Sequence, residues 1–512
     1  MKRTSPLLPT TPAFLHLQAR RRGDRGGLVY RDHHIAYAAL AAAVDELAKW
    51  LAGRGIGAGQ HVGVMVANTP AMPAATFALW GVGATSVPIS IRSTAAETAQ
   101  LLTHSRAVAL ICDAARLDVA REAAASAAVP LFAVEADLPL RPRVARRTNS
   151  DASAAARPPR LQDLAVLAYT SGTTGAPKGV MVPHGHLLWA ALACAGARGD
   201  TQDGVGASIS PLTHTPVFVS HLLCRVLLGA MTVLFERFDT ATLLDAVARH
   251  GITDVPLIGG MVFDVVGMGS VPDEVRHIVE KVSVGGAPTP MESKRKLGEI
   301  FERAEIIEAY GQTESTDGVL MARGRSVLER EGTVGRVNPH VIVALYGPDG
   351  KPVAEGGEGE IVIGGPTVMA GYYRNRDATM AALRDGWLHT GDLGRRDADG
   401  YFYLTGRVKD LIITGGENVS PLEVEEVLRA HPDVADVAVI GTPHPKWGEQ
   451  VTAIVVRRAG TAIDGDGLAA FAGSKLAGFK KPRRVEFVAS LPRNAYNKVQ
   501  THVLKQEFGR NP

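Results

Sequence analysis

Residues 167–182 read LAYTSGTTGAPKGVMV, an apolar segment that runs into a loop of glycines, hydroxyl side chains and one lysine. Gly172 and Gly175 allow positive φ and a close approach of the backbone to a ligand. The hydroxyl groups beside them offer hydrogen-bond donors, and Lys178 adds a point positive charge. This composition is suited to holding a polyphosphate, so the sequence indicates ATP or another nucleotide as a ligand.

This loop differs from the P-loop of NTPases, in which Ser or Thr follows the lysine and a helix then begins. Here Gly179 follows Lys178, and residues 180–182 continue as an apolar run. We therefore expect the loop to join two strands and not to cap a helix. Because a loop of Ser, Thr and Gly is by itself more often a solvated turn, the assignment depends on the rest of the chain.

Seven motifs in a fixed order resemble the adenylate-forming superfamily, which contains acyl-CoA synthetases and peptide-synthetase adenylation domains. The first is the loop, YTSGTTGAPKGV at residues 169–180. The others are PLTH at 211–214, GGAP at 285–288, YGQTE at 310–314, GWLHTGD at 386–392, GRVKDLIITGGENVSP at 406–421 and PRNAYNK at 492–498. The resemblance covers nearly the whole chain, and at WGE and FKKPRR it extends to CoA ligases of the benzoate type.

Length and composition are those of an ordinary globular protein. The 512 residues are too many for one hydrophobic core, and at roughly 150 residues per domain they suggest about three packing units. The net charge of +3 is too small a surplus to indicate a nucleic-acid partner. One basic cluster, residues 141–147, lies in a Pro-, Ala- and Ser-containing stretch, which predicts a solvated linker.

The cysteines and the N-terminal segment indicate in which cellular compartment we expect the protein. Cys112, Cys194 and Cys224 are far apart and lie among apolar residues, so we expect small core residues in a reducing cytoplasm. Prolines interrupt residues 1–17, and no apolar run reaches the roughly 18 residues of a membrane helix. We therefore expect neither a signal peptide nor a transmembrane segment.

The alternation of elements predicts an α/β fold. From residue 28 short β-rich runs alternate with Ala- and Leu-rich helical windows, which indicates parallel sheet covered by helices. Near Gly406 the pattern changes to that of a small α+β unit. We expect a large N-terminal domain of helix-covered sheets over residues 1–405, a hinge at 406–410 and a small mobile C-terminal domain over 411–512.

One helix of the small domain has a recognisable start. It is expected over about 421–430, with Ser420 as N-cap and Pro421 at its first position. Glu423 is placed to complete a capping box with Ser420.

Forming an acyl-adenylate requires that the phosphates be held, the adenosine anchored, and charge neutralised at the α-phosphorus. Tyr310 offers a stacking face to adenine and Asp392 offers oxygens to the ribose hydroxyls. Glu314 is the expected Mg²⁺ ligand. The residues that the resemblance places around ATP and AMP are Thr170, Ser171, Gly172, Thr173, Thr174, Gly175, Lys178, Gly285, Gly286, Ala287, Pro288, Glu308, Ala309, Tyr310, Gly311, Thr313, Asp392 and Arg407.

The resemblance also implies how the small domain acts. Lys498 would enter the active site as the catalytic cation of adenylation, beside Thr313 and Glu314, and Lys409 would be the pivot of a later rotation. After that rotation coenzyme A would attack the acyl carbonyl. The expected CoA-binding residues are Gly415, Gly416, Trp447, Phe479, Lys480, Lys481 and Arg483; a solvated basic turn before the strand expected at 484–488 is the alternative.

The resemblance assigns the acyl pocket to His214, Thr215, Pro216, Gly285, Ala309 and Gly311. His214 would line the carboxylate site; a core histidine bonded to backbone is the alternative. Because its neighbours are small and uncharged, the pocket suits an aromatic, alicyclic or medium-chain acid. Thr213, Val217 and the pair Gly259–Gly260 depart from the family pattern, so we expect pocket walls that differ from those of other members.

The function expected is that of an AMP-forming acid–CoA ligase, which converts a carboxylate, ATP and CoA into acyl-CoA, AMP and pyrophosphate. Two alternatives stay open. An adenylation enzyme would load the acyl group on a carrier protein, and an inactive homologue would only bind nucleotide. A homodimer is a further possibility.

Overall fold

The computed structural model describes residues 10–146, 154–170, 177–286, 289–493 and 499–509. The chain forms two compact units. The first contains residues 1–343 and 363–388, and the second contains residues 344–362 and 389–512.

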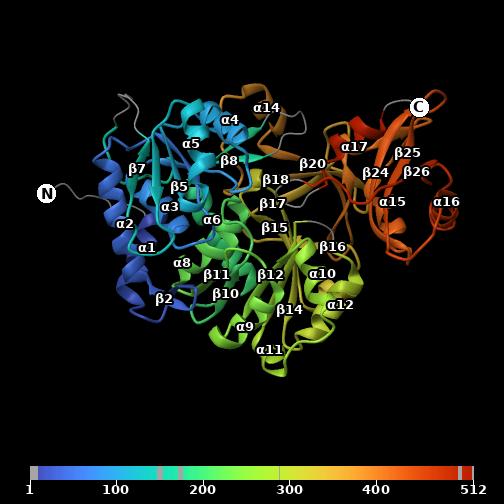
Figure 1. Cartoon of the computed structure of the whole chain (residues 1–512). Helices are drawn as coiled ribbons and strands as arrows, with labels where there is room; N and C mark the ends of the chain where they lie inside the picture. The colour runs from blue at the N-terminus through green and yellow to red at the C-terminus, as the bar shows by residue number, and fades with distance from the viewer. Residues whose placement is uncertain (1–9, 147–153, 171–176, 287–288, 494–498, 510–512) are drawn as a thin grey trace. The chain divides into compact units, whose positions relative to one another are not determined.

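One sheet of the first unit has the strand order β7-β6-β5-β3-β4-β8-β9 (Figure 1). Strand β3 is parallel to both of its neighbours, β4 and β5, and the pairs β5–β6 and β4–β8 are also parallel. Strand β7 is antiparallel to β6, and β9 is antiparallel to β8. The bounds are β3 His61–Met65, β4 Thr85–Pro88, β5 Ala109–Asp113, β6 Leu131–Val134, β7 Arg143–Arg146, β8 Leu164–Thr170 and β9 Lys178–Pro183.

Successive residues of a strand point to opposite faces of a sheet. In this sheet apolar side chains on both faces pack against helices. Leu110 and Cys112 pack with Leu102 and Ala120 in a core beneath α4 and α5. On the other face Phe132 contacts Trp50 of α2 edge to face. The bounds are α1 Thr11–Arg21, α2 Tyr37–Ala52, α3 Ala71–Gly81, α4 Ala95–Ser105 and α5 Leu117–Ser126. The helix-covered parallel sheet expected from the sequence is confirmed.

The linker expected at residues 141–147 is in part wrong. Arg143–Arg146 form strand β7 at the edge of the sheet, paired with β6. None of the four side chains is buried, and the Arg146 guanidinium donates to the carbonyl of Val129 at 2.7 Å. Long cationic side chains are compatible with an edge strand, where they discourage further strand pairing, so a basic composition did not exclude a strand.

The second sheet has the order β16-β15-β14-β13-β12-β10-β11-β1-β2 within the first unit. The six neighbouring strands β1, β11, β10, β12, β13 and β14 are parallel to one another. Strand β2 is antiparallel to β1, β15 to β14 and β16 to β15. The bounds are β1 Gly27–Tyr30, β2 His33–Ala36, β10 Val205–Ser208, β11 Met231–Leu234, β12 Asp254–Ile258, β13 Lys281–Gly285, β14 Glu305–Gly311, β15 Gly318–Arg323 and β16 Thr333–Val337.

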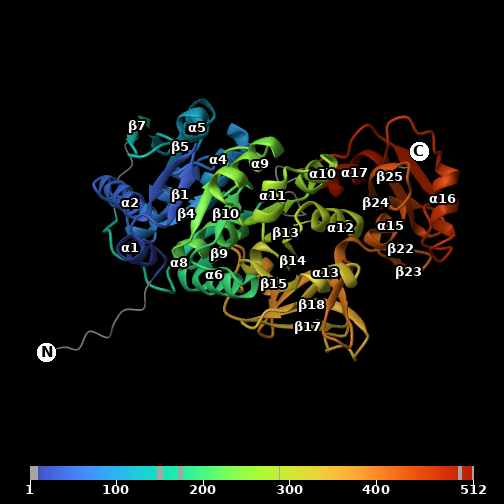
Figure 2. The same cartoon turned by 90° about the horizontal axis from the view of Figure 1, so that it is seen from below.

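The helices α9 to α13 pack on one face of this sheet through an aliphatic core that includes Leu244, Val255, Val282 and Leu297 (Figure 2). Their bounds are α9 Thr240–His250, α10 Gly260–Gly267, α11 Asp273–Ile278, α12 Met291–Ile300 and α13 Arg325–Glu329. The remaining helices of this unit are α6 His184–Arg198, α7 Thr215–Val217, α8 Cys224–Leu228 and α14 Arg376–Ala382, with a π-helix at Phe218–Leu223.

A buried ionic cluster joins α6 and α8 to β12. The carboxylate of Asp254 accepts from the guanidinium groups of both Arg198 and Arg225, and all three residues are buried. Arg198 also lies 3.3 Å from Asp200. Gly206 of the neighbouring β10 permits this approach, because a Cβ there would collide with the guanidinium of Arg225. The Lys281 ammonium also pairs with Asp200 at 3.0 Å, so two carboxylates hold the two buried guanidinium groups and this third cation.

The second unit contains two groups of strands. The strands β17, β18, β20 and β21 follow one another in that order, and a second sheet has the order β23-β22-β25-β24 with β26 on β25. The bounds are β17 Ile342–Tyr346, β18 Glu358–Gly364, β20 Trp387–Arg396, β21 Phe402–Arg407, β22 Ile412–Thr414, β23 Glu417–Val419, β24 Val434–His444, β25 Gly448–Arg457 and β26 Arg484–Phe487. The short β19, Leu383–Arg384, belongs to the first unit.

Helices α15 Pro421–Arg429, α16 Gly465–Gly473 and α17 Thr501–Phe508 complete the second unit. Val424 and Leu428 of α15 and Leu468 of α16 share a core with Val437 and Val455 of the β24–β25 hairpin. This mixture of antiparallel strands and helices is the small α+β arrangement expected for the last hundred residues.

The start of α15 differs from the sequence expectation in one respect. Ser420 is the N-cap and Pro421 follows it, but no side-chain capping bond forms. Both carboxylate oxygens of Glu423 instead accept from the Lys480 ammonium, each at 2.7 Å. The buried hydroxyl of Ser420 lies against Gly406, where a Cβ would come within 2.6 Å of it. The expected capping box was therefore wrong: Lys480 holds the Glu423 carboxylate, and the Ser420 hydroxyl is buried without a hydrogen-bond partner.

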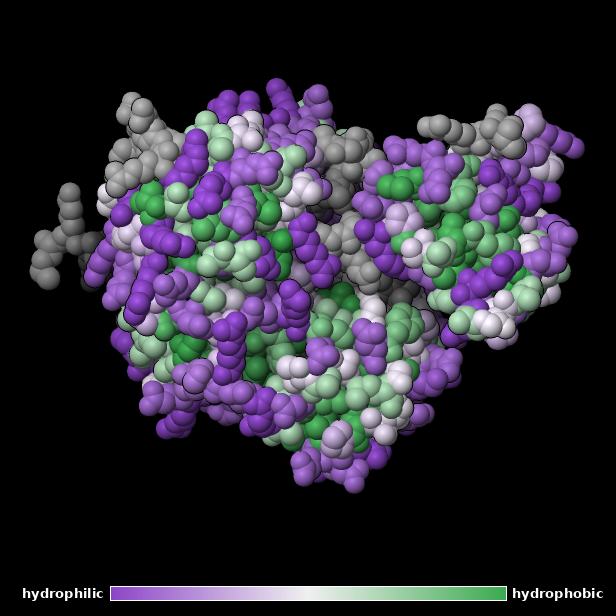
Figure 3. Space-filling model, viewed as in Figure 1, coloured by the Kyte–Doolittle hydropathy of each residue, from purple (hydrophilic) through white to green (hydrophobic). Residues whose placement is uncertain are grey.

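Hydrophilic and hydrophobic side chains alternate over the face of the molecule shown in Figure 3. Among the described residues, none of the helices has the length and hydropathy that crossing a membrane requires. Cys112, Cys194 and Cys224 are buried and unbridged, as expected.

We predict that Asp254→Ala lowers the free energy of unfolding by about 3–5 kcal/mol, because it leaves two buried guanidinium groups without their shared carboxylate. Urea unfolding followed by tryptophan fluorescence measures this. Asp273→Ala is the control: its side chain is 91% exposed and pairs with Arg276 at 3.6 Å, so the cost should stay below about 1 kcal/mol. Equal losses in the two variants would show that the cluster does not stabilise this sheet.

Candidate functional site

Two antiparallel strands flank the glycine- and hydroxyl-rich loop. Strand β8 ends at Thr170 and β9 begins at Lys178, and these two residues are directly paired. The expectation that the loop joins two strands is confirmed. Ser171, Gly172, Thr173, Thr174 and Gly175 lie outside the described residues.

A segment far along the chain, residues 369–373, runs beside β9. The Met181 N–H donates to the Gly371 carbonyl at 3.0 Å, and the Tyr373 N–H donates to the Gly179 carbonyl at 2.7 Å. Tyr372 is bridged to Val180 in antiparallel fashion. These bonds fix the Tyr372 side chain next to the start of β9.

Tyr372 connects the loop to Glu314. The Lys178 ammonium lies 5.2 Å from the centre of the Tyr372 ring, a cation–π distance, and the Tyr372 hydroxyl donates to Glu314 Oε1 at 2.9 Å. The Met369 N–H also donates to the Glu314 carbonyl at 2.8 Å. Burial, and then the Glu314 carboxylate, raises the pKa of Tyr372 above its ordinary value, so its hydroxyl remains a donor at neutral pH.

Sequence reasoning did not identify Tyr372. The available signal was the aromatic pair after Gly371 in AGYYRN, which has no periodicity of its own and reads as a turn. Its partners lie about 190 and 60 residues away in the chain, so only the fold reveals the contact.

The expected adenine-side residues gather at the carboxyl ends of β13 and β14. Gly285 is paired with Ala309 across the two strands, and Tyr310 and Gly311 follow. Gly286 has φ +74°, a conformation that a side chain would strain. In α/β sheets ligands commonly bind at this edge. Ala287 and Pro288 lie outside the described residues.

Glu308 lies within β14 and Glu314 lies in the turn that follows this strand, and the two carboxylates have different environments. Glu308 is buried and forms an ion pair with Lys294 at 2.5 Å; burial raises its pKa more than Lys294 lowers it. Glu314 lies in the short 3₁₀ turn Thr313–Ser315 and is only partly buried. Glu314 is therefore the carboxylate accessible to a cation, whereas the Glu308 side chain is engaged inside the fold.

His214 stands at the start of α7 and is partly exposed, unlike a fully buried core histidine. Asn68, which sequence reasoning did not identify, holds the loop before it. The Asn68 amide donates to the Ser210 carbonyl at 2.7 Å, and its oxygen accepts from the Leu212 N–H at 2.8 Å. The only sequence signal was a polar residue three positions after the end of strand β3.

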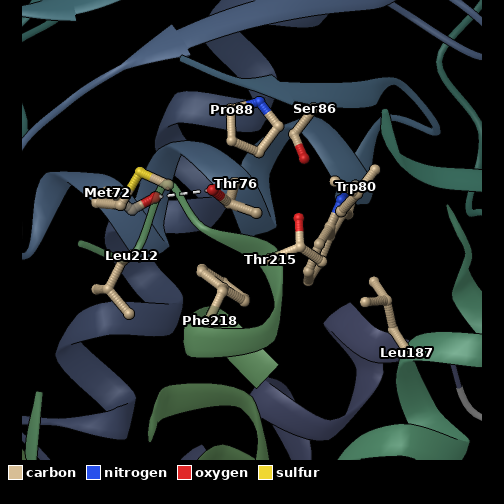
Figure 4. A pocket seen from close by; sticks show the side chains of 10 residues that line it. Met72, Thr76, Trp80, Ser86, Pro88, Leu187, Leu212, Thr215 and Phe218 are labelled. Carbon is tan, nitrogen blue, oxygen red and sulfur yellow. Dashed lines mark hydrogen bonds between the residues drawn. The ribbon is translucent and has the colours of Figure 1, made fainter. Parts of the chain in front are cut away.

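A small cavity of about 10 Å³, room for about one water molecule, lies beside Thr215 (Figure 4). The Thr215 hydroxyl is buried without a hydrogen-bond partner. Thr76 and Ser86 donate their hydroxyls to the carbonyls of Met72 and Ala165. The cavity is lined by Met72, Thr76, Trp80, Ser86, Pro88, Val166, Leu187, Leu212, Thr215 and Phe218.

Within the second unit the expected ribose-binding residues lie together. Asp392 and Arg407 face each other across β20 and β21, and the Arg407 Nε donates to Asp392 Oδ1 at 2.6 Å. The Gly391 N–H donates to Glu360 at 2.9 Å, which fixes the strand before Asp392. The hydrogen bond from Arg407 therefore fixes the position of the Asp392 carboxylate.

The residues expected to bind CoA form two groups in the second unit. Gly415 and Gly416, at φ +61° and +90°, make the β22–β23 turn, and the Gly415 N–H donates to the Trp447 carbonyl at 2.9 Å. The Arg483 guanidinium lies 3.8 Å from the centre of the Trp447 ring. The other group is Lys480, which contacts Phe479 but is paired with Glu423.

The hinge expected at Lys409 falls in the 3₁₀ turn Val408–Asp410, directly after Arg407. Lys481 follows Lys480 in the same basic segment. Lys498 lies outside the described residues.

The chain matches known proteins over nearly its full length. It is 34% identical over 475 residues to "Feruloyl-CoA synthase" of Amycolatopsis sp, covering 93% of this chain and 94% of the relative. It is 30% identical over 489 residues to "Indoleacetate--CoA ligase" of Aromatoleum aromaticum, covering 94% of each. The solved o-succinylbenzoate CoA synthetase (MenE) of Bacillus subtilis superposes with a TM-score of 0.85 at 28% identity, over 97% of this chain and 99% of that chain.

These matches confirm the fold expected from the sequence, with its large α/β part and smaller α+β part. A family model described as AMP-binding enzyme matches residues 15–373. A second model, described as AMP-binding enzyme C-terminal domain, matches residues 423–498. Since the first model alone matches well over half of the chain, the protein belongs to the AMP-binding enzyme family, within the adenylate-forming superfamily that its seven motifs resemble.

Proposed function

We propose that the protein is an ATP-dependent acid–CoA ligase that acts on an aromatic acid. A carboxylate and ATP give an acyl-adenylate and pyrophosphate, and CoA then gives the acyl-CoA and AMP. The relatives named above are called CoA synthases and CoA ligases of aromatic acids. The observation that carries the proposal is the link Lys178–Tyr372–Glu314, which joins the phosphate-loop strand to the accessible carboxylate.

In this proposal the residues of the first unit hold ATP. The segment 170–178 binds the β- and γ-phosphates, with Lys178 as its cation. Gly285, Gly286, Ala309, Tyr310 and Gly311 form the adenine-side wall. The scissile bond is then at the α-phosphorus, with pyrophosphate as the leaving group.

Mg²⁺ would be held by Glu314. Among the described residues no group of three or more His, Cys, Asp and Glu could hold a metal ion, so most of its ligands would be phosphate and water oxygens. When bound, the ion screens phosphate charge. The chain's own contribution is the Tyr372 hydroxyl, which occupies one side of the Glu314 carboxylate and leaves the other oxygen for the cation.

The second unit supplies the remaining proposed groups. Asp392, held by Arg407, accepts hydrogen bonds from the ribose hydroxyls, and Lys498 is the catalytic cation of adenylation. Residues 406–410 would be the hinge between an N-terminal domain, 1–405, and a C-terminal domain, 411–512. The C-terminal domain would rotate about Lys409. The turn at Gly415 and Gly416, bonded to Trp447, would admit the pantetheine arm. Lys480, Lys481 and Arg483 would meet the CoA phosphates, and Trp447 or Phe479 would offer a surface to the nucleotide.

His214, with Thr215 and Pro216, is proposed to line the acyl site. Cytoplasmic localisation is proposed because the three cysteines are unpaired, as in a reducing compartment. The possible homodimer also stays a proposal, which light scattering after size-exclusion chromatography would decide.

We predict that pyrophosphate release requires an aromatic acid and that AMP release is stimulated by CoA and not by a phosphopantetheinylated carrier protein. A release assay over benzoates, phenylacetates, cinnamates, cyclohexanecarboxylates and fatty acids measures both steps. Stimulation by carrier protein alone would instead support an adenylation enzyme that loads carriers. Binding of ATP without release for any acid would support an inactive homologue.

We predict that Lys178→Ala slows acyl-AMP formation by about 10²–10³-fold, because a cation near the departing phosphates is lost. Single-turnover assays of each half-reaction measure this, and thioester formation from supplied acyl-AMP should be nearly unchanged. Lys296→Ala, which removes an exposed lysine paired with Glu292, is the control and should slow neither step. Equal slowing of both half-reactions in Lys178→Ala would refute the assigned role.

We predict that Tyr372→Phe slows acyl-AMP formation by about 10–100-fold and raises the Mg²⁺ concentration that gives half-maximal rate, because the carboxylate of Glu314 loses its orienting donor. Magnesium titration of single-turnover adenylation measures this. Tyr373→Phe is the matched control, since that ring contacts His61 and His104 and not Glu314. A normal magnesium dependence in Tyr372→Phe would show that the hydroxyl is not needed.

A further inference from the structure

Asp317 lies against the proposed acyl wall. It follows Glu314 by three residues, between β14 and β15. Its backbone is so close to Gly311 that a Cβ on Gly311 would collide with the Asp317 carbonyl. The next residue, Gly318, is packed beside Ala309, where a Cβ would lie 3.6 Å from the Ala309 methyl. Gly311 and Ala309 both belong to the proposed acyl pocket.

The carboxylate of Asp317 is buried and only in part satisfied. The Cys194 thiol and the Gly318 N–H hydrogen-bond to it, whereas Oδ2 has no partner and no contact with solvent. Burial raises the pKa of Asp317 to about 6, against the smaller opposing effects of the Gly318 N–H, Cys194 and Arg198. An unpaired buried carboxylate oxygen destabilises a fold unless a ligand supplies the missing donor.

Arg198 does not neutralise this carboxylate. Its guanidinium belongs to the cluster with Asp254 and Asp200 described above. Electrostatic interactions link Arg198 to Asp317 on one side and to the buried His221 on the other, and His221 also interacts with His214. The missing donor is therefore not supplied by a neighbouring cation.

Other polar atoms near His214 also lack partners. The hydroxyls of Thr213 and Thr215 and the Nδ1 of His221 are buried and unbonded. Burial holds the pKa of His221 well below its ordinary value, so its ring is neutral. An alkyl chain would leave all of these groups unsatisfied, whereas an acid with its own polar substituent would not.

We infer that the acid substrate carries a hydrogen-bond donor on its ring, a phenolic hydroxyl or a ring N–H, and that Asp317 is the residue that accepts from it. This inference rests on the proposed acid–CoA ligase function and narrows its substrate class. It disfavours the alicyclic and medium-chain acids that the small pocket residues alone allowed. Asp317 is thus a specificity-determining residue and takes no part in the chemical step.

Matched pairs of acids that differ only in the donor test this inference. The probes are para-hydroxycinnamate with para-methoxycinnamate, para-hydroxyphenylacetate with para-methoxyphenylacetate, and indoleacetate with N-methylindoleacetate. The readout is kcat/KM for pyrophosphate release. The native protein should prefer the donor-bearing member of at least one pair by about 10–100-fold, the range expected for a hydrogen bond to a charged acceptor.

In Asp317→Ala the kcat/KM values for the two acids of a pair should differ by no more than about threefold, mainly because the KM for the donor-bearing acid rises. In the native protein the preference should increase as pH rises through 6, because the carboxylate ionises, and it should not vary in Asp317→Asn. Asp113→Asn changes another buried aspartate, on β5 of the other sheet, and should leave the preference intact.

The possible outcomes separate this inference from the function on which it rests. Release with both members of every pair at equal efficiency, or a preference that survives in Asp317→Ala, overturns the role of Asp317 and leaves the ligase function standing. Release with no acid at all overturns the proposed function itself. If Asp317→Ala does not fold, Asp317→Asn decides through its pH profile.

Discussion

The hydrogen bond from Tyr372 to Glu314 is the contact on which the proposed active site depends. It connects the turn after β14 to residues 369–373, which pair with β9 at the flank of the phosphate loop. Catalysis at the α-phosphorus requires that a cation, a carboxylate and the phosphates keep fixed mutual positions as charge develops. Backbone pairing of residues 369–373 with β9 places the tyrosine, so the geometry is built into the fold and does not depend on a flexible side chain.

Buried charge is handled in three different ways around this group. In the Arg198–Asp254–Arg225 cluster one buried carboxylate pairs with two guanidinium groups and holds α6 and α8 on the sheet. Glu308 is paired with Lys294. Asp317 lies beside the proposed acyl wall, and its Oδ2 has no hydrogen-bond partner. The ion-paired carboxylates of Asp254 and Glu308 stabilise the fold, whereas for Asp317 we infer a role in selecting the ligand.

Local sequence patterns predicted the helix-covered sheets, the strand–loop–strand at 164–183 and the α+β character of the last hundred residues. They failed where a distant partner decided the outcome. The capping box at Ser420 and Glu423 was lost to Lys480, 57 residues away, and the basic stretch Arg143–Arg146 became an edge strand because β6 offered a pairing partner. Tyr372, Asn68 and Asp317 acquire their significance only from contacts that no spacing in the chain encodes.

A double-mutant cycle between Tyr372→Phe and Glu314→Gln tests the central claim most directly, with the single-turnover rate of acyl-AMP formation as readout. If the tyrosine acts through the carboxylate, the double variant should be no slower than Glu314→Gln alone, because the hydroxyl has nothing left to orient. If the two losses instead multiply, the residues act independently and the account of this site is wrong.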